Sequence, residues 1–106
     1  MKVGFSWLIL AASIFLVLPV SADSLSARQQ ELEHLLKHDC GSCHGMTLQG
    51  GLGSSLLPGD LKERSDDALF QAIKQGLPGL AMPPWGPLLS DSDIHWLVER
   101  LRKGSM

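Results

Sequence analysis

The sequence predicts a small all-α domain in which three main helices are joined by loops. Three stretches carry apolar residues at helical spacing behind an N-cap residue. The segments between them are rich in glycine and proline. No segment shows the sustained alternation of apolar and polar residues that marks a half-buried strand, so we expect no sheet.

The start of the chain is expected to be a cleaved signal peptide, covering residues 1–22. Lys2 precedes an almost wholly apolar run over residues 5–20, and small residues lead up to a cleavage site after Ala22. The run has 16 residues, with a proline next to its end, and is short for the ~20 residues of a spanning helix. We therefore expect export to the periplasm and no stable membrane insertion. An uncleaved membrane anchor is the alternative.

The mature domain, residues 23–106, would have 84 residues with 8 basic and 11 acidic side chains. This acidic balance argues against nucleic acid as a partner, because phosphates need a basic surface. So small a core is marginal, and such domains often depend on a covalent or metal staple. The two cysteines are only three positions apart, so a disulfide between them would constrain little of the unfolded chain. We therefore expect another kind of staple.

The first helix is expected from about Ser26 to His38 and leads directly into Cys40. Ser26 and Gln29 stand in the relation of a capping box. The apolar stripe of this helix consists of Leu32, Leu35 and Leu36. The many glycines and the proline of residues 45–60 then predict an extended loop.

The second helix is expected over Asp66 to Gln75, with Ser65 as its N-cap and Gly76 as a left-handed stop. Its inward-facing residues are Leu69, Phe70 and Ile73. The next segment, residues 77–89, holds four prolines and two glycines and is predicted to be loop.

The last helix is expected from about Asp91 to Arg102, with Ser90 as its N-cap and Asp93 at the third position. Basic side chains gather in its last turn, where the helix dipole favours cations. Its buried stripe consists of Ile94, Leu97, Val98 and Leu101.

Between the first helix and the glycine-rich loop lies the motif C-x-x-C-H, formed by Cys40, Cys43 and His44, which is the pattern of covalent haem attachment. Each thiol adds to one porphyrin vinyl group as a thioether, and two intervening residues let both sulfurs reach neighbouring vinyls. His44 then lies under the iron and can coordinate it. A thioredoxin-like redox pair, half of a zinc site and a disulfide are the alternatives. The lack of a βαβ pattern argues against the first. Zinc takes four ligands, and beyond His44 only His34, His38, His95 and the carboxylates remain to supply them.

A second iron ligand is expected from the other side of the ring. Met46 lies too close to His44 to cross the haem, and Met106 stands at the end of the chain. Met82 lies in a proline-rich loop in which Pro83 biases it towards an extended backbone. Because that loop is stiff, it can hold a thioether with little loss of entropy. We expect Met82 to be this ligand.

Ligation by a histidine and a methionine would raise the reduction potential relative to two histidines. An iron with six ligands has no open position for a substrate, which favours single-electron transfer over catalysis. Bis-histidine ligation through His95 is the alternative ligand set. A haem enzyme, or a ligand sensor from which Met82 dissociates, is the alternative function.

The order of helix, C-x-x-C-H, glycine-rich loop, helix, methionine loop and terminal helix resembles the small monohaem cytochrome c fold over the whole mature chain. The strings CGSCHGMTLQGGLG and GLPGLAMPPWGPLL resemble the cytochrome c55X group, small cytochromes of nitrite-reductase gene clusters in denitrifying bacteria. The resemblance implies one covalent haem c, with thioethers at Cys40 and Cys43 and axial ligands at His44 and Met82.

The same resemblance implies a periplasmic electron carrier rather than an enzyme. Its partner would be the haem-d1-containing nitrite reductase, or a protein that acts in making haem d1. A haem-delivery or assembly factor is a third hypothesis, and we expect a monomer. The mature chain has only four lysines, unlike cytochromes that dock through a lysine ring. We therefore expect an apolar docking contact formed by Leu80, Pro83, Pro84 and Trp85.

Overall fold

The computed structural model describes residue 4 and residues 13–18 and 24–104. Most of the expected signal peptide, including its cleavage site, lies outside the described residues, so cleavage stays a prediction. Within the described part of the chain, no helix combines the length and the apolar character needed to cross a membrane.

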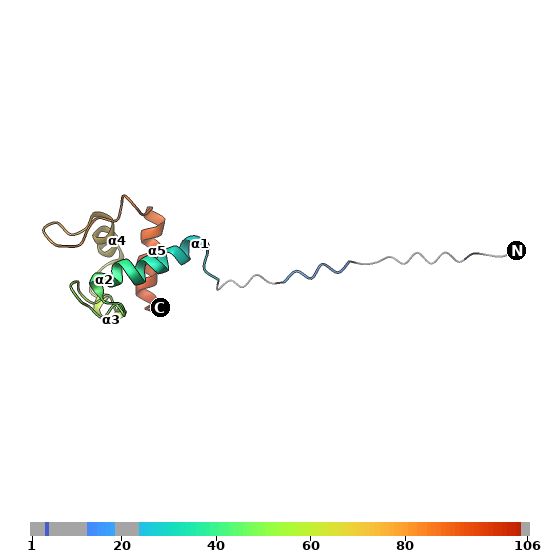
Figure 1. Cartoon of the computed structure of the whole chain (residues 1–106), viewed down its shortest axis with the longest axis horizontal. Coiled ribbons are helices and arrows are strands. Elements are labelled where there is room, and N and C mark those ends of the chain that lie inside the picture. The colour runs from blue at the N-terminus through green and yellow to red at the C-terminus, as the bar shows by residue number, and fades with distance from the viewer. Residues whose placement is uncertain (1–3, 5–12, 19–23, 105–106) are drawn as a thin grey trace.

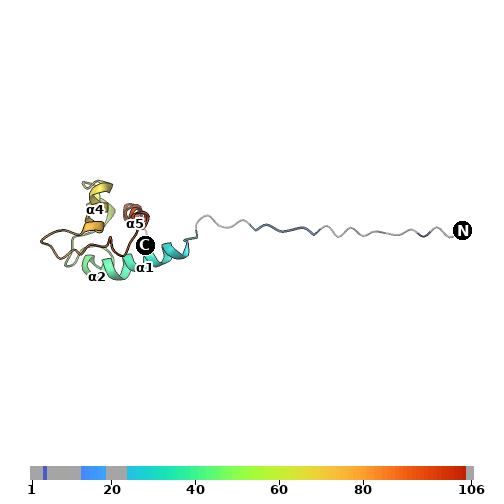
Figure 2. The same cartoon turned by 90° about the horizontal axis from the view of Figure 1, so that it is seen from above.

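The described residues form helices and loops and contain no strand, as the sequence predicts. Figures 1 and 2 show one long helical rod that is crossed at a steep angle by the terminal helix, with a third helix set beside the crossing. The elements are α1 (Ala27–Leu35), the π-helix η1 (Leu36–Cys40), α2 (Gly41–His44), α3 (Pro58–Leu61), α4 (Asp66–Gln75) and α5 (Asp91–Lys103).

The long rod consists of α1, η1 and α2, so the first helix continues six residues beyond the predicted end at His38. Its start agrees with the prediction, because the Ser26 hydroxyl accepts from the Gln29 backbone N–H and the Gln29 side chain accepts from the Ser26 N–H. The predicted end was wrong because glycine and serine inside the C-x-x-C-H motif are weak helix formers, and helix propensity is readily overridden by packing. The haem-attachment motif is therefore part of a helix.

The second predicted helix is confirmed as α4, and the Ser65 hydroxyl caps it by accepting from the Ala68 N–H at 3.1 Å. The predicted left-handed stop at Gly76 was wrong in detail. Gly76 has a positive φ of 69°, but its ψ of −173° is extended, so the chain leaves the helix directly instead of wrapping back on it. The chain thereby enters the next loop without a further turn.

The last predicted helix is confirmed as α5, which runs one residue further than expected. The Ser90 hydroxyl accepts from the Asp93 N–H, and the Asp93 carboxylate accepts from the Ser90 N–H, each at 3.1 Å. Gly104 ends the helix in the left-handed conformation.

A short helix, α3, interrupts the segment that was predicted to be loop over residues 45–60. Pro58 stands in its first turn, where a missing N–H costs nothing. The turn carries Leu61 into the core. A single helical turn has no periodicity long enough to detect, so the sequence could not reveal it.

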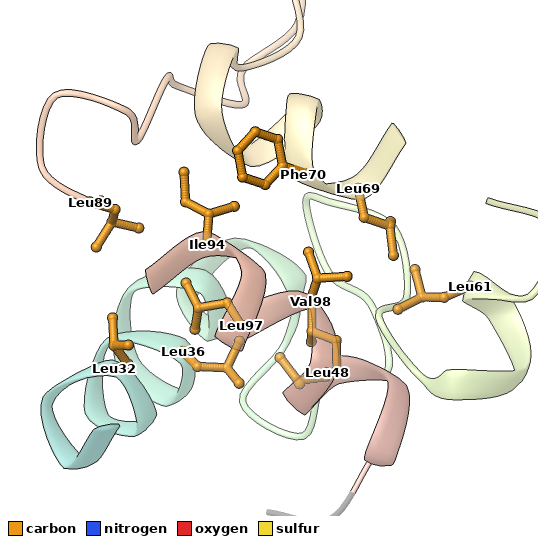
Figure 3. Packing of buried hydrophobic residues seen from close by; sticks show 11 residues of the cluster. Leu32, Leu36, Leu48, Leu61, Leu69, Phe70, Leu89, Ile94, Leu97 and Val98 are labelled. Atoms are coloured by element: carbon orange, nitrogen blue, oxygen red, sulfur yellow. The ribbon is translucent and has the colours of Figure 1, made fainter. Parts of the chain in front are cut away.

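The core contains eleven buried apolar side chains among the described residues, and Figure 3 shows them converging from the rod, α3, α4, α5 and two of the loops between them. Eight of them belong to the three predicted stripes, whereas Leu48, Leu61 and Leu89 come from segments outside those stripes. The predicted stripe residues Leu35 and Ile73 are partly buried and pack against this core. The apolar pattern therefore located most of the core.

Two ion pairs join α1 to α5 across the rod. Arg28 donates to both carboxylate oxygens of Asp93, from Nη2 at 2.7 Å and from Nε at 3.2 Å. Arg100 forms an ion pair with Glu33. The Arg28 contact, assisted by the hydrogen bonds from Ser90, lowers the pKa of the Asp93 carboxyl to about 2. The helix crossing is thus stabilised by charge as well as by apolar packing.

Candidate haem site

One cavity of about 790 Å³ is lined by all four residues predicted to bind the cofactor. Its volume lies within the range of ~300–1,000 Å³ that is usual for cofactor and small-molecule sites. The motif residues Cys40, Cys43 and His44 reach it from the end of the rod, and Met82 reaches it from the loop after α4. Most of its wall is apolar and includes Leu36, Leu61, Leu69, Ile73, Trp85 and Leu97.

The His44 ring is oriented by a hydrogen bond to the backbone. Its Nδ1 lies 2.7 Å from the Ser54 carbonyl oxygen, and a carbonyl can only accept, so Nδ1 carries the hydrogen. The lone pair is therefore on Nε2, which is the arrangement found for histidines that bind metals. The donor set at this end of the cavity fits an axial ligand of haem iron.

Gly53 leaves room for this ring. A Cβ atom at Gly53 would lie only 2.7 Å from both Nδ1 and Cε1 of His44, well inside van der Waals contact. The glycine therefore allows the backbone to press against the face of the imidazole.

The segment after the motif, residues 45–57, is called the His44 loop here. It is tied back to α2, because Gly50 donates to the His44 carbonyl at 2.8 Å and Gly53 donates to the Cys43 carbonyl at 2.7 Å. The Ser55 hydroxyl donates to Asp60 at 2.6 Å and holds the far end of the loop against α3. These bonds fix the Ser54 carbonyl that receives the His44 hydrogen.

The segment that carries Met82, residues 77–84, is called the Met82 loop. It is closed by a hydrogen bond from the Leu77 N–H to the Met82 carbonyl at 3.2 Å. Within it, the Leu80 N–H donates to the Leu77 carbonyl at 3.0 Å and forms a turn. Gly76 permits this closure, since a Cβ there would lie 2.6 Å from the Met82 carbonyl oxygen. After the loop, Trp85 donates to the Ile73 carbonyl at 2.9 Å and returns the chain to α4.

The alternative iron ligands lie elsewhere. Among the described residues, Met82 is the only methionine that lines this cavity, while Met46 borders a different one. His95 is exposed on α5 and stacks on Phe70, with ring centroids 4.5 Å apart. Met106 lies outside the described residues. The geometry of the cavity therefore favours the predicted ligand over its competitors.

The two cysteines differ from a reactive dithiol pair. Both are free thiols, and burial, with smaller contributions from Asp39 and Cys43, raises the pKa of the Cys40 thiol to about 11. Redox-active pairs have a lowered pKa instead. Within the described residues, no group of three or more His, Cys, Asp or Glu side chains is placed to hold a metal ion, which argues against zinc.

Sequence reasoning missed the two residues that orient His44. The Ser54 carbonyl acts through the backbone, so no side-chain type marks it. Gly53 was one of several glycines in a segment interpreted only as loop. The one available signal is the position of this glycine cluster directly after the motif, because a loop that must pass close to a ring needs residues without Cβ.

Comparisons with known proteins find similarity to cytochromes. Residues 27–99 match the family model described as cytochrome c oxidase, cbb3-type, subunit III. A curated relative, cytochrome c55X of Pseudomonas aeruginosa, is 45% identical over 102 residues, covering 94% of this chain and 86% of that protein.

Two solved structures share the fold. A c-type cytochrome named NirC has 46% sequence identity and a TM-score of 0.74, covering 77% of this chain and 96% of its own. The dihydro-heme d1 dehydrogenase NirN, in complex with DHE, has 31% identity and a TM-score of 0.62. That match covers 66% of this chain but 15% of NirN, so the likeness concerns a small part of the larger protein.

Proposed function

This chain belongs to the cytochrome c55X family of c-type cytochromes, which carry covalently bound haem c, and we propose that it transfers single electrons in the periplasm during denitrification. One observation carries the proposal. The C-x-x-C-H motif and Met82 face the same apolar cavity, and the His44 ring has its Nε2 lone pair available there.

In this proposal each site residue has a separate role. Cys40 and Cys43 hold the porphyrin as thioethers, His44 binds the iron through Nε2, and Met82 binds it through its sulfur. The haem supplies the one-electron chemistry. A neutral thioether favours ferrous iron, and two protein ligands leave no open position for a substrate. Electron transfer is therefore favoured over catalysis.

The surface beside the Met82 loop is the proposed contact for a redox partner. Leu80 is 70% exposed, Pro83 and Pro84 are exposed, and Trp85 is partly buried at the cavity wall. These side chains carry no charge, so docking through them should be insensitive to salt. Steep loss of the electron-transfer rate at high ionic strength would count against this contact.

For the partner we propose the haem-d1-containing nitrite reductase, or an enzyme that makes haem d1. The likeness to part of a dihydro-heme d1 dehydrogenase supports a partner that handles this cofactor. Stopped-flow mixing of the reduced holoprotein with oxidised nitrite reductase tests the first choice. We expect one electron to pass per molecule. Absence of transfer to nitrite reductase, with transfer to a haem-d1-forming enzyme, would select the second.

An assembly role predicts a different phenotype. Without the gene, an electron donor leaves the reductase intact but slow, whereas an assembly factor leaves it without its d1 haem. Analysis of the cofactor content of reductase purified from a deletion strain separates the two. The electron-carrier proposal fails if that reductase lacks haem d1 and regains full activity when haem d1 is supplied.

Export is part of the proposal and has its own test. Fractionation of cells that express the full chain should place the haem protein in the periplasm. Intact-mass measurement should show loss of residues 1–22 and a gain of one haem. A haem protein that retains its first residues and stays with the membranes would instead indicate an anchor.

The second candidate function is a ligand sensor or haem enzyme. It is favoured by the Met82 loop, which has one closing hydrogen bond and one internal turn among the described residues. If the Met82 sulfur leaves the iron readily, carbon monoxide binds the reduced protein at rest. We expect no such binding in the wild type. Ready binding would move the proposal from electron carrier to sensor.

A further inference from the structure

A pair of histidines lies outside the haem cavity. His34 and His38 are both exposed, and their ring centroids are 4.2 Å apart with the ring planes tilted by 42°. Both border a second cavity, of about 610 Å³, that lies between the rod, the start of the His44 loop and the end of α5. The haem site uses neither residue.

The helix itself brings the two rings together. Residues four positions apart lie on the same face of an α-helix, one turn above the other. Here the helix changes from α1 to η1 between the two histidines. Two imidazoles at this spacing on one helical face are an established arrangement for binding a metal ion.

The surroundings limit how the site is completed. Glu33 also borders the cavity, but Arg100 engages its carboxylate. Within the described residues no third His, Cys, Asp or Glu joins the pair. An ion held here would therefore have two protein ligands and water at its other positions. Imidazole nitrogens suit late transition metals, and Cu²⁺ binds most tightly among the divalent first-row ions.

We propose that His34 and His38 form a surface site for a divalent transition-metal ion, with Cu²⁺ as the ion bound most tightly. The site is separate from the haem and independent of the electron-carrier proposal. Its occupancy depends on solvent-exposed side chains, so it fills and empties without unfolding the domain.

Calorimetric titration of the oxidised holoprotein with Cu²⁺, in a buffer that binds copper weakly, tests the site. We expect one ion per chain. His34→Ala and His38→Ala should each weaken binding by roughly tenfold or more, because either change leaves a single imidazole. The matched control is His95→Ala, which removes an exposed histidine on α5 and should leave the affinity unchanged.

Other outcomes would overturn the proposal. Equal copper affinity in the wild type and in a variant with both histidines replaced would show that copper binds elsewhere. An affinity that falls only when His95 is replaced would have the same meaning. The haem absorption spectrum of every variant should match the wild type, so that a change in folding is not mistaken for a lost ligand.

Discussion

The two loops that line the haem cavity are held in different ways. The His44 loop is bonded back to α2 at Cys43 and His44, is joined to α3 through Ser55, and contributes Leu48 to the core. The Met82 loop has one closing bond and one internal turn among the described residues. Its Leu80 is 70% exposed, whereas Leu48 is 6% exposed.

This difference indicates that the two expected iron ligands, His44 and Met82, are held with unequal firmness. The His44 side is held by several hydrogen bonds and by a buried leucine side chain. The Met82 side is held by few protein contacts. Its conformation is restricted mainly by its prolines and by the cofactor that would occupy the cavity. We infer that the cavity has one firmly held side, which carries His44, and one lightly held side, which carries Met82.

The largest effect is expected from removing the two cysteines that would attach the haem between the loops. Replacing Cys40 and Cys43 with alanine should abolish covalent haem and lower the free energy of unfolding by several kcal/mol, because the apolar side chains that line the cavity lose the ring against which they would pack. Haem that remains with the chain after denaturing electrophoresis would contradict this. Ser42→Ala, between the two cysteines, should retain the haem.

A smaller effect is expected from crowding the His44 side. Gly53→Ala would place a Cβ 2.7 Å from the His44 ring, so we expect a loss of about 1–3 kcal/mol in unfolding free energy and an altered haem spectrum. Chemical denaturation and absorption spectroscopy provide both readouts.

Gly59→Ala is the matched control for that change, since a Cβ at Gly59 in α3 meets nothing within 4 Å. It should preserve the spectrum and leave stability equal or slightly higher, because alanine favours a helix. Equal effects of the two substitutions would show that the His44 loop is less tightly packed than its geometry indicates.

The smallest effect is expected far from both loops, at the crossing of α1 and α5. Contact with Arg28 lowers the pKa of Asp93 from its ordinary value of 3.8 to about 2. The stabilisation is therefore fully present above about pH 4 and is lost as the pH falls towards 2. Asp93→Asn should cost of order 1 kcal/mol near neutral pH, and this difference should vanish in acid.

Denaturation curves of the wild type and Asp93→Asn between pH 2 and 7 measure this dependence. Asp67→Asn, which alters an exposed carboxylate in α4, is the control and should follow the wild type. An unchanged haem spectrum in both variants would show that the crossing is energetically separate from the two loops.

Much of this fold could be predicted from the sequence. Capping residues and apolar stripes located α4 and α5 closely, and the cytochrome family, the all-α fold and the haem cofactor are confirmed by the relatives and the solved structures. The extension of the first helix to His44 and the single turn at Pro58 were missed. Both depend on tertiary packing, which local propensity does not contain.

The part of the site that consists of ligating side chains could be predicted from the sequence. Cys40, Cys43, His44 and Met82 carry reactive or ligating atoms, and the structure brings all four to one cavity. The Ser54 carbonyl and the space at Gly53 were not foreseeable, because a backbone acceptor and a missing Cβ leave no distinctive residue pattern. Export and the identity of the iron ligands remain predictions.

Absorption spectra of the oxidised holoprotein test the ligand assignment most directly, using Met82→Ala and the matched Met46→Ala. A thioether bound to ferric haem gives a weak charge-transfer band at the red end of the visible spectrum. We expect this band in the wild type and in Met46→Ala, and we expect Met82→Ala to lose it and to bind carbon monoxide when reduced. A Met82→Ala protein that keeps the band and excludes carbon monoxide would contradict the account.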